Sequence, residues 1–301
     1  MWPVSAVVRD GDVTRDDDTD RSGRVVPIRH TAALRRESCT DLGLPAGDTD
    51  PVNVPSPGPA AAAIVLAGGS GTRLGAERNK VYLPLRGRPV LAWSLATFTA
   101  MPEVGVIVLV VREPDRPLAD RILAEHTAGG VEIVIGGSTR QESELAGLRR
   151  LAARIDADEI DAVLVHDAAR PLAGRELASS VLAAARDAGG AVPGLWRDDL
   201  AAAAPGGSGL AGPSPDALVA VQTPQAFRAA PLLAAYEEAA SRGFVGTDTA
   251  SCMERFAPDV PIRWVRGDER NIKITYAHDL LVAEHAAPQL MDPVPAPRGR
   301  W

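Results

Sequence analysis

The sequence is poor in cysteine, with only Cys39 and Cys252 among 301 residues. Two cysteines this far apart provide neither a disulfide framework nor the close spacing of a metal site, and such usage is typical of a reducing compartment. No apolar run approaches the roughly 18 residues of a membrane-spanning helix, and the N-terminus lacks the apolar core of a secretory signal. We therefore expect a cytoplasmic protein that has no membrane partner.

Positive charge is not in excess either. The chain has 32 Lys and Arg against 39 Asp and Glu, a net charge of −7. This balance argues against a general nucleic-acid-binding protein, whose surface would be basic, but it allows a local basic pocket for phosphates. Apolar residues make up 46% of the chain, which is enough for a substantial core. The length is compatible with one large domain or two small ones.

The first 58 residues contain short acidic clusters and end in a proline-rich stretch. Such a segment cannot bury enough apolar surface to offset the entropy lost on ordering. We predict a disordered N-terminal tail over 1–58, one domain over 59–287 and a loose C-terminal tail over 288–301. A metal site in the acidic clusters is the alternative interpretation of the N-terminal tail, and a solvated tail is the simpler one.

From residue 60 onward, short apolar runs alternate with segments that have helical spacing of apolar residues. This alternation predicts an α/β fold, in which helices cover both faces of a mostly parallel, twisted sheet. Region 196–217, rich in Ala and then in Gly, Pro and Ser, breaks the alternation and predicts a protruding arm. The predicted strands are 60–67, 104–111, 131–135, 162–165, one from 191, and 218–222. The predicted helices are 90–100, 115–126, one from about 141, 176–187, 231–241, 248–255 and 278–286.

A glycine loop follows the first predicted strand. Gly68, Gly69 and Gly71 have no side chains, so their backbone N–H groups can approach an anion closely. Arg73 and Lys80 follow, which allows two cations to flank the bound group. The loop lacks the Gly-Lys-Ser/Thr ending of a P-loop and the third glycine of the dinucleotide fingerprint. It therefore predicts a polyphosphate site of another kind, with a plain glycine turn and surface cations as the alternative.

Further polar motifs stand where later strands are predicted to end. Ligands of open parallel sheets bind beyond the carboxyl ends of the strands, so these motifs are expected to gather at one edge. A purely structural sequence would not require this recurrence. The motifs are Gly136-Gly-Ser-Thr-Arg-Gln-Glu-Ser143, His166-Asp-Ala-Ala-Arg-Pro171, Gln222-Thr-Pro-Gln225, Gly246-Thr-Asp248 and Asn271-Ile-Lys-Ile-Thr275.

Six motifs occur together in the order found in one enzyme family: Leu-Ala-Gly-Gly-Ser-Gly-Thr-Arg-Leu-Gly, Lys-Val-Tyr-Leu-Pro, Gly-Gly-Ser-Thr-Arg-Gln-Glu-Ser, His-Asp-Ala-Ala-Arg-Pro, Thr-Pro-Gln and Asn-Ile-Lys-Ile-Thr. From about Ala60 to Glu284 the chain resembles the 2-C-methyl-D-erythritol 4-phosphate cytidylyltransferases, whose family also contains ribitol-5-phosphate cytidylyltransferases. The resemblance implies a Rossmann-like nucleotidyltransferase that forms a homodimer through its arm. It also implies transfer of CMP from CTP to a polyol phosphate, with release of pyrophosphate and with Mg²⁺ or another divalent cation.

The resemblance assigns roles to individual residues. Fixed cations can stabilise the crowded phosphorus centre of such a reaction, and the matching catalytic positions are Arg73, Lys80 and Lys273. Asp167 matches the metal-binding aspartate, since a carboxylate suits the hard Mg²⁺ ion. The implied nucleotide-binding residues are Ala67, Gly68, Gly69, Ser70, Gly71, Thr72, Gly136, Gly137, Arg140 and Ser143. The implied substrate-binding residues are Arg170, Thr223, Thr247 and Asp248.

Each of these assignments has a structural alternative, because surface charges, turns and helix N-caps are common roles for the same residue types. His166 is expected to be a packed or hydrogen-bonded neighbour rather than a base, because the attacking phosphate is already anionic.

The arm departs from the family pattern. In the methylerythritol enzymes it carries Asp-Thr-x-Lys and later an Arg, whereas this chain has Arg197-Asp-Asp-Leu-Ala201 and places Ser214 or Pro215 where the Arg is expected. No Lys or Arg occurs from 200 to 225. The first expectation for the acceptor is methylerythritol phosphate, for isoprenoid precursor synthesis. Ribitol 5-phosphate or another alditol phosphate is the alternative. A weakly active nucleotide-binding regulatory protein is a further alternative from another class.

Overall fold

The structure is a computed structural model, and it describes residues 59–69, 79–127, 129–199, 201–203, 210–213 and 218–287. The predicted tails, 1–58 and 288–301, lie outside the described residues. So do Ser70, Gly71, Thr72 and Arg73 of the glycine loop. None of the described helices is long and apolar enough to cross a membrane.

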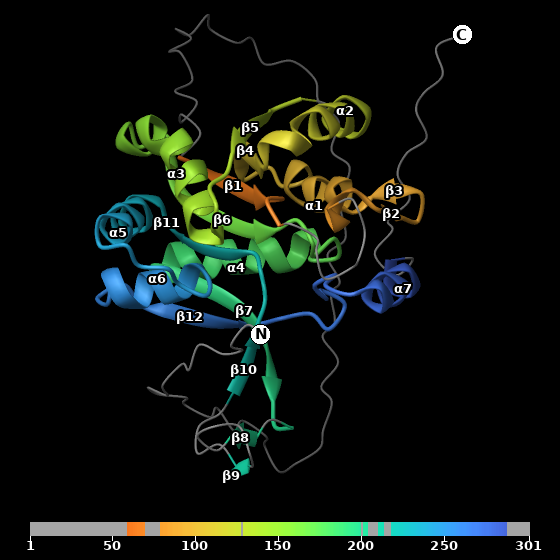
Figure 1. Ribbon diagram of the computed structural model, residues 1–301. Helices are drawn as coiled ribbons and strands as arrows, with labels where there is room; N and C mark the ends of the chain where they lie inside the picture. Colours follow the sequence, from red (N-terminus) through yellow and green to blue (C-terminus); the bar gives the residue numbers. More distant parts are fainter. Residues whose placement is uncertain are drawn as a thin grey trace, which may run out of the picture. The chain divides into compact units, whose positions relative to one another are not determined.

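Among the described residues, eight strands form one mixed sheet (Figure 1). Four neighbouring strands are parallel to one another, as the alternating pattern predicts. In spatial order these are β5 (Val131–Ile135), β4 (Val104–Val111), β1 (Ala60–Leu66) and β6 (Ile160–Asp167). The sheet continues through β11 (Gln225–Arg228) to β7 (Gly190–Arg197), with β10 (Leu218–Val221) and β12 (Ile262–Arg266) also paired with β7.

Helices cover both faces of this sheet (Figure 1). Successive residues of β1 point to opposite faces: Ala63 and Val65 join one apolar cluster, and Ala62 and Ile64 join the other. The first face carries α1 (Val90–Thr99), α2 (Arg116–His126) and α4 (Arg175–Ala188). The second carries α3 (Arg140–Asp156), α5 (Ala229–Ser241) and α6 (Thr249–Phe256). The predicted two-sided α/β fold is therefore confirmed.

A smaller apolar cluster lies apart from the two faces. Ala283 of α7 (Ala277–Ala286) packs there with Leu85, Leu172 and Ile274. Leu85 belongs to a short hairpin of β2 (Pro84–Leu85) and β3 (Arg88–Pro89). Two 3-10 turns precede other elements: η2 (Lys80–Tyr82) comes before β2, and η3 (Glu113–Asp115) comes directly before α2.

Two strands of the main sheet were missing from the sequence prediction. β11 is antiparallel to both β6 and β7, and it runs directly into α5, which hides its pattern behind that of the helix. β12 has the sequence Ile-Arg-Trp-Val-Arg, without a clear alternation, and pairs with β7 at the side away from β11. The helices predicted from apolar spacing are all present, with ends displaced by a few residues.

The predicted arm is partly described. β7 pairs with β11 only through its first residues, while Gly194–Arg197 pairs with β10 as an antiparallel ribbon. β8 (Ala201–Ala203) and β9 (Leu210–Pro213) form a separate antiparallel pair. Apart from the bend at 198–199, strands account for those parts of 196–217 that the structure describes.

Candidate active site

The parallel strands bring their carboxyl ends to one edge of the sheet. Leu66 of β1 is in register with Val110 of β4 and with Asp167 of β6. The backbone N–H of Ala67 donates to the Val110 carbonyl (2.8 Å), and that of Ala168 donates to the Leu66 carbonyl (3.0 Å). The glycine loop therefore begins directly beside Asp167.

Three of the predicted nucleotide-binding residues meet at this edge. A Cβ atom on Gly136 would lie 2.6 Å from Ser143 Oγ and 2.9 Å from Val110 Cγ1, so only glycine fits without displacement. A Cβ atom on Gly68 would lie 3.6 Å from the same Ser143 hydroxyl. The turn after β5, the glycine loop and the first turn of α3 are therefore in close contact.

The start of α3 is fixed by a capping box. The Thr139 hydroxyl accepts the backbone N–H of Glu142 (3.1 Å), and Glu142 Oε2 accepts the backbone N–H groups of Ser138 (2.7 Å) and Thr139 (3.3 Å). A side chain on Gly137 would overlap Glu142. Ser143 Oγ donates to the Thr139 carbonyl (2.8 Å). These bonds satisfy helix N-terminal donors and hold the Gly136–Ser143 turn in one conformation.

Lys80 is positioned by a neighbour that the sequence analysis did not single out. Asn79 is buried, and its Nδ2 donates to the carbonyl of Ala67 (2.7 Å). Its Oδ1 accepts the backbone N–H of Val81 (3.4 Å), which caps the short η2 turn. Lys80, half-buried, is the first residue of that turn. The hydrogen bond from Asn79 to Ala67 therefore holds the segment that begins at Asn79 against the end of β1.

Asp167 lies among three cations. Its Oδ2 is 2.7 Å from Lys273 Nζ and 3.9 Å from Arg170 Nε, and its Oδ1 is 3.4 Å from Arg140 Nη2. Burial alone would raise the pKa of Asp167, but Lys273, Arg140 and Arg170 outweigh it and hold the pKa well below the usual 3.8. Asp167 is therefore ionised at neutral pH and has a strongly positive neighbourhood.

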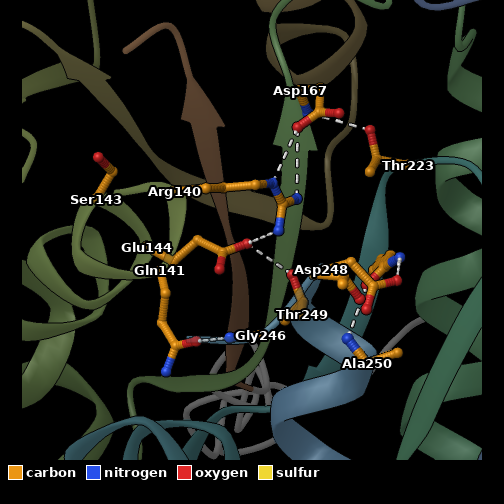
Figure 2. Close-up of polar contacts among 12 residues, drawn as sticks. Arg140, Gln141, Ser143, Glu144, Asp167, Thr223, Gly246, Asp248, Thr249 and Ala250 are labelled. Atoms are coloured by element: carbon orange, nitrogen blue, oxygen red, sulfur yellow. Dashed lines mark hydrogen bonds and ion pairs between the residues drawn. The ribbon is translucent and has the colours of Figure 1, made fainter. Parts of the chain in front are cut away.

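Arg140 links Asp167 to a second buried carboxylate, as Figure 2 shows. Its Nη1 is 2.5 Å from Oε1 of Glu144, one helical turn along α3. Glu144 is 1% exposed, and its oxygens also accept hydrogen bonds from Tyr236 Oη (2.6 Å) and Thr249 Oγ1 (2.8 Å). Burial raises the pKa of Glu144, while the carboxylates of Glu144 and Asp167 keep Arg140 protonated.

His166 is part of a hydrogen-bonded chain that supports the site. Thr223 Oγ1 accepts the backbone N–H of Asp167 (3.0 Å), so its own hydrogen is available for His166 Nδ1 (3.1 Å). The other ring nitrogen, Nε2, then donates to the carbonyl of Arg170 (3.1 Å). Burial lowers the pKa of His166 to about 4, so the ring is neutral. His166 is a packed, hydrogen-bonded neighbour of the site, as expected from the sequence.

Arg170 is engaged by backbone carbonyls. Its Nη1 donates to the carbonyl of Asn271 (2.8 Å) and its Nη2 to that of Val221 (3.4 Å). Asn271 Nδ2 donates in turn to the carbonyl of Thr223 (2.9 Å). Burial lowers the pKa of Arg170, although Asp167 opposes this effect. These bonds tie the segment before β11 to the segment that carries Lys273.

The two residues predicted after Gly246 lie at the start of α6, where Asp248 contacts Gln225 of β11. Asp248 caps α6: its Oδ1 accepts the backbone N–H of Ser251 (3.0 Å), and its Oδ2 accepts Gln225 Nε2 (2.9 Å). Thr247 is exposed, and its backbone N–H donates to Ser251 Oγ (3.0 Å). This loop is attached to α3 by Gln141, whose Oε1 accepts the backbone N–H of Gly246 (2.5 Å). A substrate role for either residue stays a prediction.

Several of these supporting residues were not found by sequence reasoning. Gln141 and Gln225 lie within motifs but were given no role, whereas Asn79 and Glu144 lie outside the motifs, and nothing in the identity of these four residues indicates burial. For Glu144 one indication existed, its i,i+4 spacing from Arg140. The other partners of Glu144, Tyr236 on α5 and Thr249 on α6, lie 92 and 105 residues away in sequence, where no local pattern could indicate them.

A doubly wound α/β sheet that gathers a glycine loop and fixed cations at its carboxyl edge defines a protein of the nucleotidyltransferase type. The comparison with protein families gives the particular group. The family model described as 2-C-methyl-D-erythritol 4-phosphate cytidylyltransferase matches residues 61–288. The chain belongs to this family, whose members are CTP-dependent cytidylyltransferases.

Individual relatives agree with this assignment. A 2-C-methyl-D-erythritol 4-phosphate cytidylyltransferase of Thermobifida fusca is 41% identical over 235 residues, covering 75% of this chain and 92% of the relative. One of Geobacter metallireducens is 38% identical over 224 residues, covering 74% and 95%.

Solved structures show the same similarity. The 4-diphosphocytidyl-2C-methyl-D-erythritol synthase of Anaerococcus prevotii has a TM-score of 0.67 at 29% identity, covering 76% of this chain and 96% of that one. The 2-C-methyl-D-erythritol 4-phosphate cytidylyltransferase of Thermus thermophilus has a TM-score of 0.58 at 32% identity, covering 76% and 99%.

Proposed function

We propose that this protein transfers CMP from CTP to 2-C-methyl-D-erythritol 4-phosphate, releasing pyrophosphate, in the non-mevalonate synthesis of isoprenoid precursors. The observation that carries the proposal is the cluster of Lys273, Arg140 and Arg170 around Asp167, beside a glycine loop, in a chain of this family. A cation-rich edge next to glycine backbone suits a triphosphate and a second phosphate together.

The reaction forms one bond and breaks one. A phosphate oxygen of the acceptor attacks the α-phosphorus of CTP, and the bond from that phosphorus to the bridging oxygen of the β-phosphate breaks. The bridging oxygen leaves with the electron pair as part of pyrophosphate. Because the attacking oxygen is already anionic, no general base is required, which agrees with the neutral, buried His166. Stabilising the charge at phosphorus is left to fixed cations, and we assign this role to Arg73, Lys80 and Lys273.

The nucleotide would lie against Ala67, Gly68 and Gly69 and the turn from Gly136 to Ser143. Ser70, Gly71 and Thr72 are proposed to bind the nucleotide as well. The close packing of Gly68, Gly136 and Ser143 supports the assignment, because it leaves backbone groups rather than side chains along the edge. The side chain of Arg140 emerges from the same turn toward Asp167.

Asp167 fits a divalent cation as a single protein ligand. Among the described residues, no group of three or more His, Cys, Asp or Glu side chains could hold a metal ion. A cation here would therefore take its remaining ligands from phosphates and water, as Mg²⁺ commonly does. The low pKa keeps Asp167 ionised for this purpose, and the half-exposed Lys273 can withdraw from it. When bound, such an ion would neutralise charge on the triphosphate.

The acceptor side supports a second candidate. The 200–225 segment has no Lys or Arg, so the acceptor phosphate has fewer cations available from the arm than the family pattern supplies. Arg170 is already committed to two carbonyls, which leaves Lys273 as the more accessible of these two cations near Asp167. Ribitol 5-phosphate or another alditol phosphate is therefore the alternative acceptor. Thr223, Thr247 and Asp248 remain the proposed contacts to the polyol.

We further propose that the protein works in the cytoplasm as a homodimer joined through the arm. The antiparallel β7–β10 ribbon and the exposed Trp196 on it support this arrangement, because such a ribbon offers backbone and apolar surface to a partner. Light scattering after size-exclusion chromatography would show twice the chain mass.

The decisive experiment measures pyrophosphate release from CTP and Mg²⁺ with separate acceptors: methylerythritol 4-phosphate, ribitol 5-phosphate and erythritol 4-phosphate. We expect the highest kcat/KM with methylerythritol 4-phosphate. A clearly higher value with ribitol 5-phosphate would replace the acceptor while keeping the chemistry. If the protein binds CTP but releases no pyrophosphate with any acceptor, the proposed transfer reaction is wrong.

A further inference from the structure

Glu144 is a buried carboxylate to which the proposed reaction gives no role. It lies on α3, is 1% exposed, and faces three donors: Arg140, Tyr236 and Thr249. The hydroxyl groups of Tyr236 and Thr249 could pair with either form of the carboxyl group, but the guanidinium of Arg140 cannot accept a proton, so its 2.5 Å ion pair with Glu144 favours the ionised carboxylate. The surroundings are therefore those of a counter-ion to Arg140.

Arg140 is shared unequally between two carboxylates. Its Nη1 is 2.5 Å from Glu144 Oε1, whereas its Nε and Nη2 are both 3.4 Å from Asp167 Oδ1. The contact with Glu144 is the short one, and the contact with Asp167 is long for a charge-assisted hydrogen bond. Asp167 can thus exchange Arg140 for another partner, while Arg140 keeps its counter-ion.

Glu144 itself is held from two other helices. Tyr236 lies on α5 and Thr249 is the first residue of α6, and both side chains are buried. Their hydroxyl groups donate to opposite oxygens of the carboxylate, Tyr236 to Oε2 and Thr249 to Oε1. Figure 2 shows the connection running from Thr249 through Glu144 and Arg140 to Asp167. The carboxylate is therefore preoriented before any ligand arrives.

We propose that Glu144 is a positioning residue: it fixes the Arg140 guanidinium at the nucleotide side of the site, so that Asp167 can release Arg140 to a bound CTP–metal complex without leaving a buried, unpaired cation. The inference rests on the proposed function in that it takes CTP as the ligand. Glu144 touches neither the nucleotide nor the reacting atoms in this account, and it acts entirely through Arg140.

The first test is the dissociation constant of CTP with MgCl₂, measured by calorimetry without an acceptor so that no turnover occurs. In Glu144→Gln the amide cannot act as a counter-ion, so Arg140 moves toward Asp167 and competes with the ligand. We expect the dissociation constant to rise about tenfold or more, the size of one charge-assisted hydrogen bond. A well-folded Glu144→Gln variant that binds CTP like the wild type overturns the proposal.

A matched control separates positioning from general loss of a carboxylate. Glu132 also pairs with arginines, Arg150 and Arg154, at 2.6 Å each, but it lies near the other end of the sheet. Glu132→Gln should leave the CTP dissociation constant within about twofold of the wild type, the limit of what a distant pair contributes. An equal loss of CTP affinity in both variants would contradict a specific role for Glu144.

Two further variants test the route through Arg140. In an Arg140→Met background, Glu144→Gln should add less than about twofold to the dissociation constant, because coupled residues are not additive. A full additional loss there would show that Glu144 acts by another route. Tyr236→Phe, which removes one donor to Glu144, should raise the constant by about two- to fivefold. It decides the question if Glu144→Gln does not fold, and an unchanged constant in Tyr236→Phe would then count against the proposal.

A crystal structure of Glu144→Gln without ligand separates this inference from the proposed reaction. We expect the distance from Arg140 Nη2 to Asp167 Oδ1 to shorten from 3.4 Å to hydrogen-bond length. If the guanidinium stays in place, the positioning role is wrong whatever the activity. If it moves but the wild type transfers no CMP, the proposed reaction fails while the positioning role stands.

Discussion

The two ends of the central sheet carry the same types of charged residue in different settings. At the amino end, Glu132 bridges Arg150 and Arg154, and Asp161 pairs with Arg186, all at 2.6 to 2.7 Å. These arginines are 34 to 54% exposed. At the carboxyl end, by contrast, the Asp167 and Glu144 side chains are 12% and 2% exposed, and most of their contacts with arginine are longer.

The difference lies in how completely the charges compensate one another. At the carboxyl end three cations, Arg140, Arg170 and Lys273, surround two carboxylates, Asp167 and Glu144, which leaves one positive charge in excess. Arg170 is 3.9 Å from its carboxylate, so the cluster is not optimised for internal pairing. An ion pair that only stabilises the surface would have shorter nitrogen–oxygen distances and equal numbers of positive and negative groups. The excess of fixed positive charge suits a site that receives phosphate.

The largest effect we expect is on turnover, from the two loop cations. Arg73→Ala and Lys80→Ala should each lower kcat by about a hundredfold to a thousandfold, the usual contribution of one electrostatic stabiliser. Arg150→Ala, which removes a cation at the amino end, is the matched control and should leave kcat unchanged. The measurement is pyrophosphate release at saturating CTP, with circular dichroism to confirm folding.

A loop variant that keeps wild-type turnover would remove that residue from the catalytic set. If Arg150→Ala were equally inactive, the contrast between the two ends of the sheet would not be functional.

The parallel half of the fold could be predicted because its strands and helices show their apolar patterns in short, continuous stretches of sequence. Strands β1 and β4 are continuous apolar runs, and α3 shows its apolar spacing directly. The motif residues Gly136, Ser143 and Asp167 could be assigned to one edge because parallel strands place their carboxyl ends together. The same reasoning predicted β10 as 218–222 but did not find β11 or the antiparallel pairing of both strands with β7, since these depend on where the chain returns.

The supporting residues of the site were beyond sequence reasoning for a different reason. Glu144 and Asn79 are polar residue types that are usually exposed, and only tertiary packing buries them. Their partners, Tyr236 and Ala67, are set by the fold rather than by nearby sequence. A motif identifies the residues that carry the chemistry, but the residues that orient them become visible only with the contacts.

The second prediction concerns protonation, which burial alters at the carboxyl end. The pKa of His166 falls from the usual 6.5 to about 4 in the folded protein, because burial disfavours the charged ring. The unfolded chain therefore binds a proton at a higher pH than the folded one does. The free energy of unfolding is therefore unaffected by this group above pH 6.5 and falls as the pH drops toward 4. At pH 4.5 the loss amounts to about 2 to 3 kcal/mol.

His166→Gln isolates this contribution, since Gln does not titrate and can still donate to the Arg170 carbonyl. Urea unfolding of both proteins at pH 7 and pH 4.5 is the measurement. The wild type should lose about 2 to 3 kcal/mol more free energy of unfolding than the variant between these two values. Equal losses in both proteins would mean that His166 is protonated as readily in the folded protein as in the unfolded chain.

The smallest effect should come from breaking a pair at the amino end. Glu132→Gln removes the shared partner of Arg150 and Arg154, both of which can turn to solvent, since their side chains are 54% and 36% exposed. We expect the free energy of unfolding to fall by only about 0 to 1 kcal/mol, and kcat to stay at the wild-type value. Glu144→Gln makes the same chemical change where the arginine, Arg140, is only 19% exposed, and there the loss should be about 3 kcal/mol or more. Urea unfolding of the two variants side by side measures the difference, and equal losses would show that burial does not distinguish the two ends of the sheet.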